Sequence, residues 1–247
     1  MENQRKPEAK IAKRTLPPPL RESIEHIFDQ QIEGVALVGG TALAGYYAGH
    51  RRSDDIDLFV RNEVSFRSAI LAVKSLEKIG ASISQPTQSK QYFHALCLYR
   101  KHSFTVDVVL DENLFQVGSF ELSGKTCVAS LKTLLRMKIA TLVSRASEKD
   151  LFDVRWLLQH FSSLTIPEWI SLGQSIDKGV SGENLMASIG GTTLRKEACG
   201  FSTDPSQSAD LVFKELVSYQ RKLVRELITY LKSLPTPPLG KLVKRLK

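Results

Sequence analysis

Two aspartates in residues 55 to 60 are the side chains of this chain best suited to chemistry on phosphate groups. The segment alternates acidic or aromatic residues with aliphatic ones, so a strand would place Asp55 and Asp57 on the same face, roughly 6.5 to 7 Å apart. Two carboxylates so close repel each other unless a cation lies between them, and Mg²⁺ favours such oxygens together with substrate phosphates. We therefore expect a site for Mg²⁺, or Mn²⁺ in its place, and in-line displacement at phosphorus.

A glycine pair comes shortly before these aspartates. Residues 35 to 38 form a short apolar run that predicts a strand, Gly39 and Gly40 end it, and residues 41 to 48 predict a helix with the hydroxyl of Thr41 near its start. A helix start presents unpaired backbone N–H groups, and glycine lets a phosphate approach the backbone closely. The triphosphate of a nucleotide could bind at this turn.

Asp107 lies at the centre of the apolar run 104 to 110, which predicts a buried strand. Burying an aspartate without a partner is costly. Either Asp107 is hydrogen-bonded or on an edge strand, or it coordinates a metal beside Asp55 and Asp57. We favour coordination.

Two predicted helices within residues 130 to 160 carry further charged residues toward the core. Lys138 falls on the apolar stripe of the first helix, where its ammonium either reaches out to solvent or points into the site and holds a substrate phosphate. Asp150 lies on the inward face of the second helix, although a carboxylate near a helix start is also favourable for dipole reasons alone.

These motifs resemble those of the AbiEii/AbiGii-type nucleotidyltransferases. These are polymerase-β-like proteins, many of which act as toxins in bacterial toxin–antitoxin and abortive-infection systems. The resemblance covers roughly residues 20 to 160. The matching residues are, in chain order, Gly39-Gly40-Thr41-Ala42-Leu43, His50-Arg51-x-Ser53-x-Asp55-Ile56-Asp57-Leu58-Phe59, Lys138, Arg145 and Lys149-Asp150-x-x-Asp153.

The resemblance implies an α+β fold in which a nucleotidyltransferase-type mixed sheet flanked by helices is followed by a mainly helical C-terminal part. The implied roles are triphosphate binding for Gly39, Gly40 and Thr41, metal binding for Asp55 and Asp57, nucleotide binding for Lys138, a catalytic or orienting role for Asp150, and support of the phosphates or the loop for Arg51 and Ser53. The metal-binding role of Asp107 is supported only by its position in the predicted strand. The implied reaction moves a nucleoside monophosphate from a nucleoside triphosphate to an acceptor hydroxyl, at the 3′ end of tRNA or another RNA or on a protein side chain. A cognate antitoxin is a further possible partner.

Pro, Gly and charge patterns divide the chain into four parts. We expect a flexible basic tail over residues 1–19, a nucleotidyltransferase core over 20–128, a mainly helical domain over 129–234 and a basic tail over 235–247. Within the helical part, residues 177–206 are rich in Gly, Ser and Thr and predict a loop or mobile flap.

The composition is that of an ordinary soluble protein, with 42% hydrophobic and 24% charged residues in 247. Most of the net charge of +8 comes from the two ends of the chain. Basic tails can hold RNA, though they are more often merely solvated. The three scattered cysteines lack metal-binding spacing and are typical of free thiols in a reducing cytoplasm, and no signal or membrane segment is expected.

Two other functions fit the same residues. A non-catalytic nucleotide- or partner-binding protein of this fold would bind nucleotide without turnover, and a nucleic-acid-binding module would act through the basic tails. The joint presence of the carboxylates and Lys138 favours catalysis.

Overall fold

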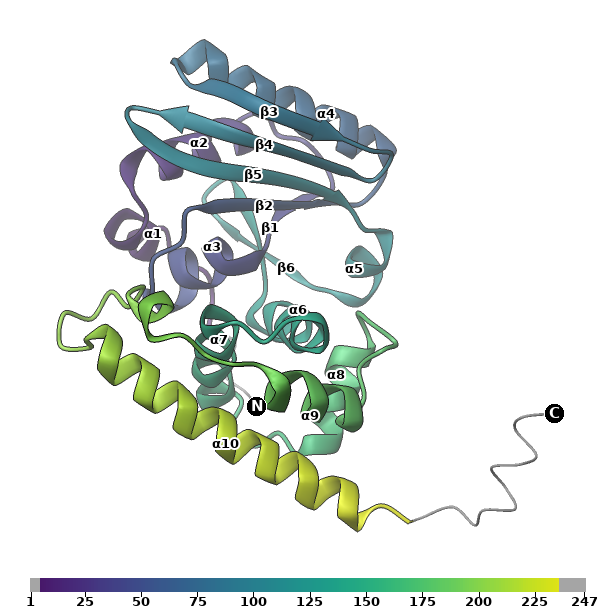
Figure 1. Ribbon diagram of the computed structural model, residues 1–247. Helices are drawn as coiled ribbons and strands as arrows, with labels where there is room; N and C mark the ends of the chain where they lie inside the picture. The colour runs from purple at the N-terminus through teal and green to yellow at the C-terminus, as the bar shows by residue number, and fades with distance from the viewer. Residues whose placement is uncertain (1–4, 236–247) are drawn as a thin grey trace.

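The computed structural model describes residues 5–235, in which a seven-stranded mixed sheet is combined with a group of C-terminal helices (Figure 1). The spatial order of the strands is β3-β4-β5-β2-β1-β7-β6. Strands β2 and β5 are parallel, as are β1 and β7, and the other neighbours are antiparallel. This arrangement confirms the predicted α+β class. The strands are β1 (Val35–Leu37), β2 (Asp55–Val60), β3 (Ser82–Gln88), β4 (Tyr92–Tyr99), β5 (His102–Leu110), β6 (Phe120–Ser123) and β7 (Thr126–Ala129).

The helices fall into an N-terminal set around the sheet and a C-terminal set below it in the view of Figure 1, with α10 along the bottom. The first set comprises α1 (Ala9–Thr15), α2 (Pro18–Phe28), α3 (Gly39–Leu43), the π-helix η1 (Ala44–Ala48), α4 (Glu63–Lys74), the 3₁₀-helix η2 (Ser75–Ile79) and α5 (Glu112–Val117). The second comprises α6 (Leu131–Ser144), α7 (Glu148–His160), α8 (Ile166–Gln174), α9 (Gly182–Gly191), the 3₁₀-helix η3 (Lys196–Cys199) and α10 (Ala209–Ser233).

The alternation of residues along β2 and β5 separates two faces of the sheet. Ile56, Leu58, Val106 and Val108 are fully buried. Helix α4 packs against β2 and β5, and α2 packs against β5. The alternate positions in these strands are partly buried or exposed, and they include the polar residues Asp55, Asp57, Thr105 and Asp107. The sheet therefore has one apolar core face and one face available for chemistry.

Serine side chains mark where the C-terminal helices begin. The hydroxyl oxygens of Ser130, Ser147 and Ser208 each accept a hydrogen bond from the backbone N–H three residues later, at the starts of α6, α7 and α10. Such capping satisfies one of the N–H groups that a helix start leaves unpaired. The sequence therefore determines locally where these helices begin, as at Ala209 for α10.

The described part of the predicted tail over residues 1–19 contains a helix that was not predicted from the sequence. Helix α1 buries Ile11 and Ala12 against η1, while its basic residues stay exposed. Pro18 opens α2, because the fixed φ of proline suits the first turn of a helix, where no N–H partner is needed. Residues 1–4 of the predicted tail, and the predicted basic tail after Pro235, lie outside the described residues.

The predicted loop over residues 177–206 is also wrong, because it contains α9 and η3. Ser181 caps α9, and Leu185 and Ile189 lie one turn apart and are fully buried where α9 packs on α10. Two buried apolar side chains outweigh the low helix propensity of the surrounding glycines. The predicted helix 41–48 is in turn split into α3 and the π-helix η1. Within residues 5–235, no helix is long and apolar enough to cross a bilayer.

Candidate active site

Three aspartates come together on the polar face of the sheet. In the β2–β5 pair, Asp57 lies opposite Asp107 and Asp55 lies opposite Thr105. In the β5–β4 pair, His94 lies opposite Asp107. Asp57, Asp107 and His94 therefore form one row across three adjacent strands, with Asp55 two residues along β2. The structure thus brings the two aspartates of β2 beside the third, as the coordination hypothesis requires.

Neighbouring side chains already hold two of these carboxylates. The hydroxyl of Thr105 donates to Asp55 Oδ1 at 2.8 Å. Asp107 Oδ1 accepts from the Tyr92 hydroxyl at 2.5 Å and lies 2.8 Å from Nδ1 of His94. Asp107 is therefore hydrogen-bonded, which was one of the alternatives for it, but it is not on an edge strand, because β5 lies between β2 and β4. Among the described residues, Asp107 Oδ2 has no hydrogen-bond partner and stays open to a ligand.

Asp57 has an unfavourable environment for a negative charge. Burial raises the pKa of Asp57 to about 6, and the charges of Asp55 and Asp107 act in the same direction, while Lys138 and Arg145 oppose them only in part. A cation at this position would relieve the repulsion. Within residues 5–235 no three His, Cys, Asp or Glu side chains converge closely enough to hold a metal ion by themselves. Ligands from a bound substrate would have to complete such a site, as is common for Mg²⁺.

The glycine pair lies directly against these groups. Gly39 has a φ of +68°, in the left-handed region, and a Cβ atom there would collide with Oδ2 of Asp57. A Cβ at Gly40 would lie only 3.0 Å from the Ser53 hydroxyl and closer still to the Arg51 guanidinium. Glycine is therefore needed at both positions to bring the turn and the residues behind it together.

Thr41 has a structural task in addition to its predicted role. Its side chain is fully buried, and its hydroxyl donates to the backbone carbonyl of Asp55. This hydrogen bond joins the start of α3 to the start of β2, so the side chain is not free for a phosphate. The predicted contact of Thr41 with a nucleotide stays a prediction and would involve its backbone N–H.

A buried cluster of ion pairs joins the start of β2 to α6 and α7. Two guanidinium nitrogens of Arg51 donate to the two oxygens of Asp153 at 2.6 and 2.7 Å. The ammonium of Lys138 lies 2.8 Å from Asp153 Oδ2 and 3.0 Å from Asp150 Oδ1. Lys138 is only 8% exposed, so the alternative in which it reaches out to solvent is wrong. Asp150 points inward as predicted, where it also accepts from the Ser147 hydroxyl at 2.6 Å.

All four charged groups of this cluster remain ionised. Burial disfavours the charged carboxyl of Asp153, but Lys138 and Arg51 hold its pKa well below its usual range. Asp150 follows the same pattern, with burial outweighed chiefly by Lys138 and Ser147. Two buried cations are thus matched by two buried anions, which is the condition under which such a cluster is tolerated.

Sequence reasoning missed several residues of this region. His50 lies 2.9 Å from Asp153, so that Asp153 is shared by His50, Arg51 and Lys138. In the sequence, Asp153 was noticed only as part of the family motif. Tyr92 and His94 were not singled out either. Their alternate spacing in β4 was the available signal, but only the register of β4 with β5 reveals that they contact Asp107.

Comparison with known proteins identifies the family of this chain. The family model described as "Nucleotidyl transferase AbiEii toxin, Type IV TA system" matches residues 24–172, more than half of the chain. No protein with a curated functional description matches the sequence.

Two solved structures share the fold. JHP933 from Helicobacter pylori is 14% identical with a TM-score of 0.52, over 89% of this chain and 97% of that one. MenT4, a nucleotidyltransferase toxin from Mycobacterium tuberculosis H37Rv, is 16% identical with a TM-score of 0.54, over 92% of this chain and 89% of that one. The family match confirms the predicted resemblance, and the chain belongs to the AbiEii family of nucleotidyltransferase toxins.

Proposed function

We propose that this protein transfers a nucleoside monophosphate from a nucleoside triphosphate to an acceptor hydroxyl in a metal-dependent reaction, as the toxin of a bacterial toxin–antitoxin or abortive-infection system. The observation that carries the proposal is the placement of Asp57 beside Asp55 and Asp107 and directly against Gly39. Membership of the AbiEii family supports the reaction class.

The carboxylates would bind a divalent cation together with oxygens of the substrate. Asp55, Asp57 and Asp107 would hold Mg²⁺ or Mn²⁺, which when bound would offset negative charge on the phosphates. Two observations support this assignment. Burial and the charges of Asp55 and Asp107 raise the pKa of Asp57, and among the described residues Oδ2 of Asp107 has no hydrogen-bond partner.

The residues of the chain suggest how the reactants would be arranged. Without a Cβ at Gly39 and Gly40, the triphosphate can approach the backbone at the start of α3. The acceptor oxygen would form a bond to the α-phosphorus as the bond to pyrophosphate breaks. Oδ2 of Asp107 would either complete the metal site or take the proton of the acceptor hydroxyl. The positive charge of Lys138 would offset negative charge that develops on the phosphates. Asp150 would orient Lys138 through the 3.0 Å ion pair.

Arg51 and Ser53 would act from the same side. Both are almost fully buried, and both lie next to Gly40, so they would support the turn that binds the phosphates. The acceptor would be the 3′ end of tRNA or another RNA, or a protein side chain, and an antitoxin would be the regulatory partner in the cytoplasm. The division into a core over residues 20–128 and a helical domain over 129–234 stays a prediction.

The test compares the Asp57→Ala and Asp54→Ala variants with the unchanged protein. Each is incubated with Mg²⁺, one α-labelled nucleoside triphosphate at a time, total cellular RNA and bulk protein, and the products are separated on a gel. Asp54 is the matched control, because its exposed carboxylate faces His102 at 3.2 Å and belongs to no part of the proposed site.

We expect label on an RNA or protein band with the unchanged protein and with Asp54→Ala, and none with Asp57→Ala or after EDTA treatment. Transfer that survives Asp57→Ala in a correctly folded variant would contradict the proposal. The labelled band would also identify the nucleotide and the class of acceptor together.

A further inference from the structure

Asp107 is held by two side chains of the neighbouring strand β4. Its Oδ1 accepts a hydrogen bond from the Tyr92 hydroxyl at 2.5 Å and lies 2.8 Å from Nδ1 of His94. An ionised carboxylate only accepts hydrogen bonds, so Nδ1 of His94 is also a donor here. Both donors therefore meet the same oxygen, and among residues 5–235 nothing hydrogen-bonds to Oδ2.

The register of β4 brings the two donors together. Tyr92 and His94 are two residues apart and lie on one face of the strand, while Phe93 and Ala95 point into the core and are almost fully buried. His94 lies directly opposite Asp107 in the β4–β5 pair. The rings of Tyr92 and His94 are nearly parallel, with an angle of 17° and 6.4 Å between their centres. The two rings therefore lie side by side next to Asp107.

Asp107 is not held by a cation, because within the described part of the chain no lysine or arginine forms an ion pair with it. The negative charge of Asp57 in the next strand repels its carboxylate. The terminal torsion of an aspartate is soft, so this carboxylate would turn away from Asp57 unless it were held. Asp55 is held in a similar way, since Thr105 donates to its Oδ1 at 2.8 Å and no described residue hydrogen-bonds to its Oδ2. Both carboxylates beside Asp57 thus have Oδ1 held and Oδ2 open.

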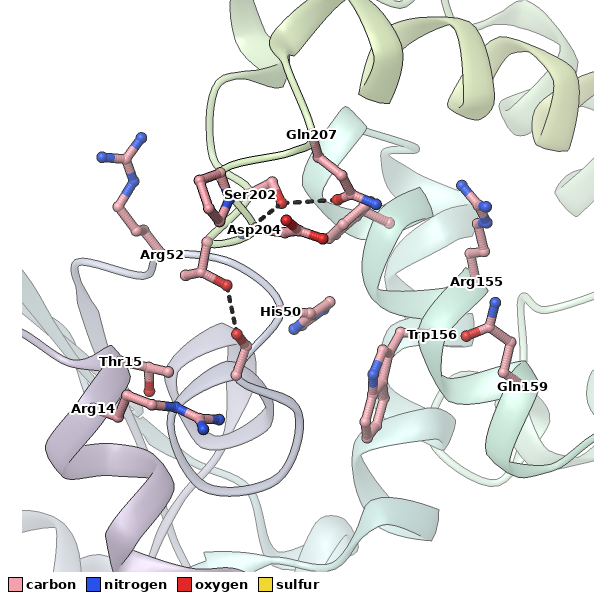
Figure 2. A pocket seen from close by; sticks show the side chains of 14 residues that line it. Arg14, Thr15, His50, Arg52, Arg155, Trp156, Gln159, Ser202, Asp204 and Gln207 are labelled. Carbon is pink, nitrogen blue, oxygen red and sulfur yellow. Dashed lines mark hydrogen bonds between the residues drawn. The ribbon is translucent and has the colours of Figure 1, made fainter.

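The pair of His50 and Asp153 provides a contrast. Figure 2 shows His50 at the wall of a cavity of about 840 Å³, beside Trp156. Its ring stacks on Phe152 with 5.2 Å between the ring centres, and Asp153 is also bound by two buried cations. His50 is therefore one of several groups that hold Asp153, and its removal would disturb the packing. The side chain of His94 is 32% exposed, so it can be replaced with little effect on the core.

We propose that Tyr92 and His94 are positioning residues, which hold Oδ1 of Asp107 and thereby fix Oδ2 as a ligand for the divalent cation. This inference rests on the proposed function, because the cation is the one assigned there to Asp55, Asp57 and Asp107. Tyr92 and His94 act through Asp107, since a carboxylate that is already ordered loses less freedom when the cation binds. Loss of such a supporting hydrogen bond typically weakens metal binding about 10- to 100-fold. Of the two roles open to Oδ2, metal coordination is the one that this arrangement favours.

The test removes the two donors one at a time. Tyr92→Phe deletes the hydroxyl and keeps the ring, and His94→Leu deletes the ring nitrogen that faces Asp107. His94→Asn is the conservative variant, because the side-chain amide of asparagine can donate from nearly the position of Nδ1. Both side chains are partly exposed, so we expect all three variants to fold, which circular dichroism verifies.

The same two strands supply matched controls. The Tyr99 hydroxyl donates to Glu22 at 3.2 Å, and Nε2 of His102 lies 3.2 Å from Oδ1 of Asp54. Tyr99→Phe and His102→Leu therefore remove the same chemical groups from carboxylates that belong to no part of the proposed site.

The measurement is Mn²⁺ binding without turnover. Each protein is titrated with Mn²⁺ in the presence of each of the four α,β-methylene nucleoside triphosphates in turn, whose methylene bridge cannot be cleaved. Bound Mn²⁺ is detected by the faster relaxation of water protons around an ion immobilised on a protein. Asp57→Ala is titrated in parallel, and only Mn²⁺ binding that is lost in this variant is assigned to the site.

We expect Tyr92→Phe and His94→Leu each to raise the Kd for Mn²⁺ by about 10-fold or more. Tyr99→Phe and His102→Leu should stay within about twofold of the unchanged protein. His94→Asn should restore most of the affinity that His94→Leu loses, because it again offers a donor to Oδ1. General damage to the fold would not be repaired in this way.

Three outcomes would overturn the inference. If Mn²⁺ binding is lost in Asp57→Ala but unchanged in Tyr92→Phe and His94→Leu, the metal site stands and the two side chains do not position its ligand. Equal weakening in these variants and in the controls would show that the effect is not specific to Asp107. If the unchanged protein has no Mn²⁺ binding that depends on Asp57, the proposed metal site itself is wrong, so the two failures are distinguishable.

Discussion

The contact between Gly39 and Asp57 can be tested by adding a single methyl group. The substitution Gly39→Ala acts in two ways. Alanine in the left-handed conformation required by the φ of +68° costs about 1–2 kcal/mol of folding free energy. Its Cβ would also collide with Asp57 Oδ2, so that either the carboxylate or the start of α3 must move. By analogy with overpacked cores, this collision adds about 1–3 kcal/mol.

Gly124 provides the matched control for the backbone term. Its φ of +63° is almost the same, but a Cβ there would meet no heavy atom within 4 Å. Gly124→Ala should therefore lower the free energy of unfolding by about 1–2 kcal/mol, and Gly39→Ala by more. Urea unfolding of both variants, monitored by circular dichroism, measures the difference.

A second substitution identifies the atom responsible. In an Asp57→Ala background the carboxylate is gone and the closest remaining atom is the Cβ of residue 57, at 3.0 Å. Gly39→Ala should then cost little more than Gly124→Ala. The reasoning fails if Gly39→Ala is no more destabilising than the control, or if removing the Asp57 carboxylate leaves its cost unchanged.

Three further substitutions test the site's electrostatics and hydrogen bonding. Because burial raises the pKa of Asp57 to about 6 from 3.8, the folded state holds the proton more tightly, and stability is lost as the pH rises from about 4 to 6. Without metal, Asp57→Asn should therefore have a higher free energy of unfolding than the unchanged protein at pH 7.5, by up to about 3 kcal/mol. This difference should disappear by pH 4. A difference that stays constant in urea unfolding at four pH values would refute the prediction. Asp153→Asn should lower the free energy of unfolding by about 3–5 kcal/mol, because it leaves Arg51 and Lys138 buried without their shared partner, whereas Glu215→Gln at a half-buried pair should cost less than about 1 kcal/mol. If Asp153→Asn and Glu215→Gln lowered the thermal midpoint equally, the large cost predicted for Asp153→Asn would be wrong. Thr41→Val should cost about 1–3 kcal/mol, because the Asp55 carbonyl loses its donor, and Thr41→Ser should restore most of it; identical midpoints for Val and Ser would show that the hydrogen bond contributes nothing.

Local patterns in the sequence were sufficient for the parts of the site that lie close together in the chain. The alternation of Asp55 and Asp57 with aliphatic residues determines which face of β2 is polar, because side chains of a strand alternate in direction. The glycine pair determines the turn against Asp57, since no other residue tolerates the conformation and the close contact at Gly39. Serine caps determine where α6, α7 and α10 begin.

Only the tertiary structure decided which distant residues meet. Nothing in the spacing of residues shows that β5 pairs with β2 in the register that places Asp107 opposite Asp57, or that β4 adds Tyr92 and His94 to the same carboxylate. The role of Asp153 as the shared partner of His50, Arg51 and Lys138 likewise depends on how α7 packs beside α6 and the start of β2. The physical reason is that strand register and helix packing are selected by the burial of the whole apolar core, whereas motif spacing records only what neighbouring residues can do.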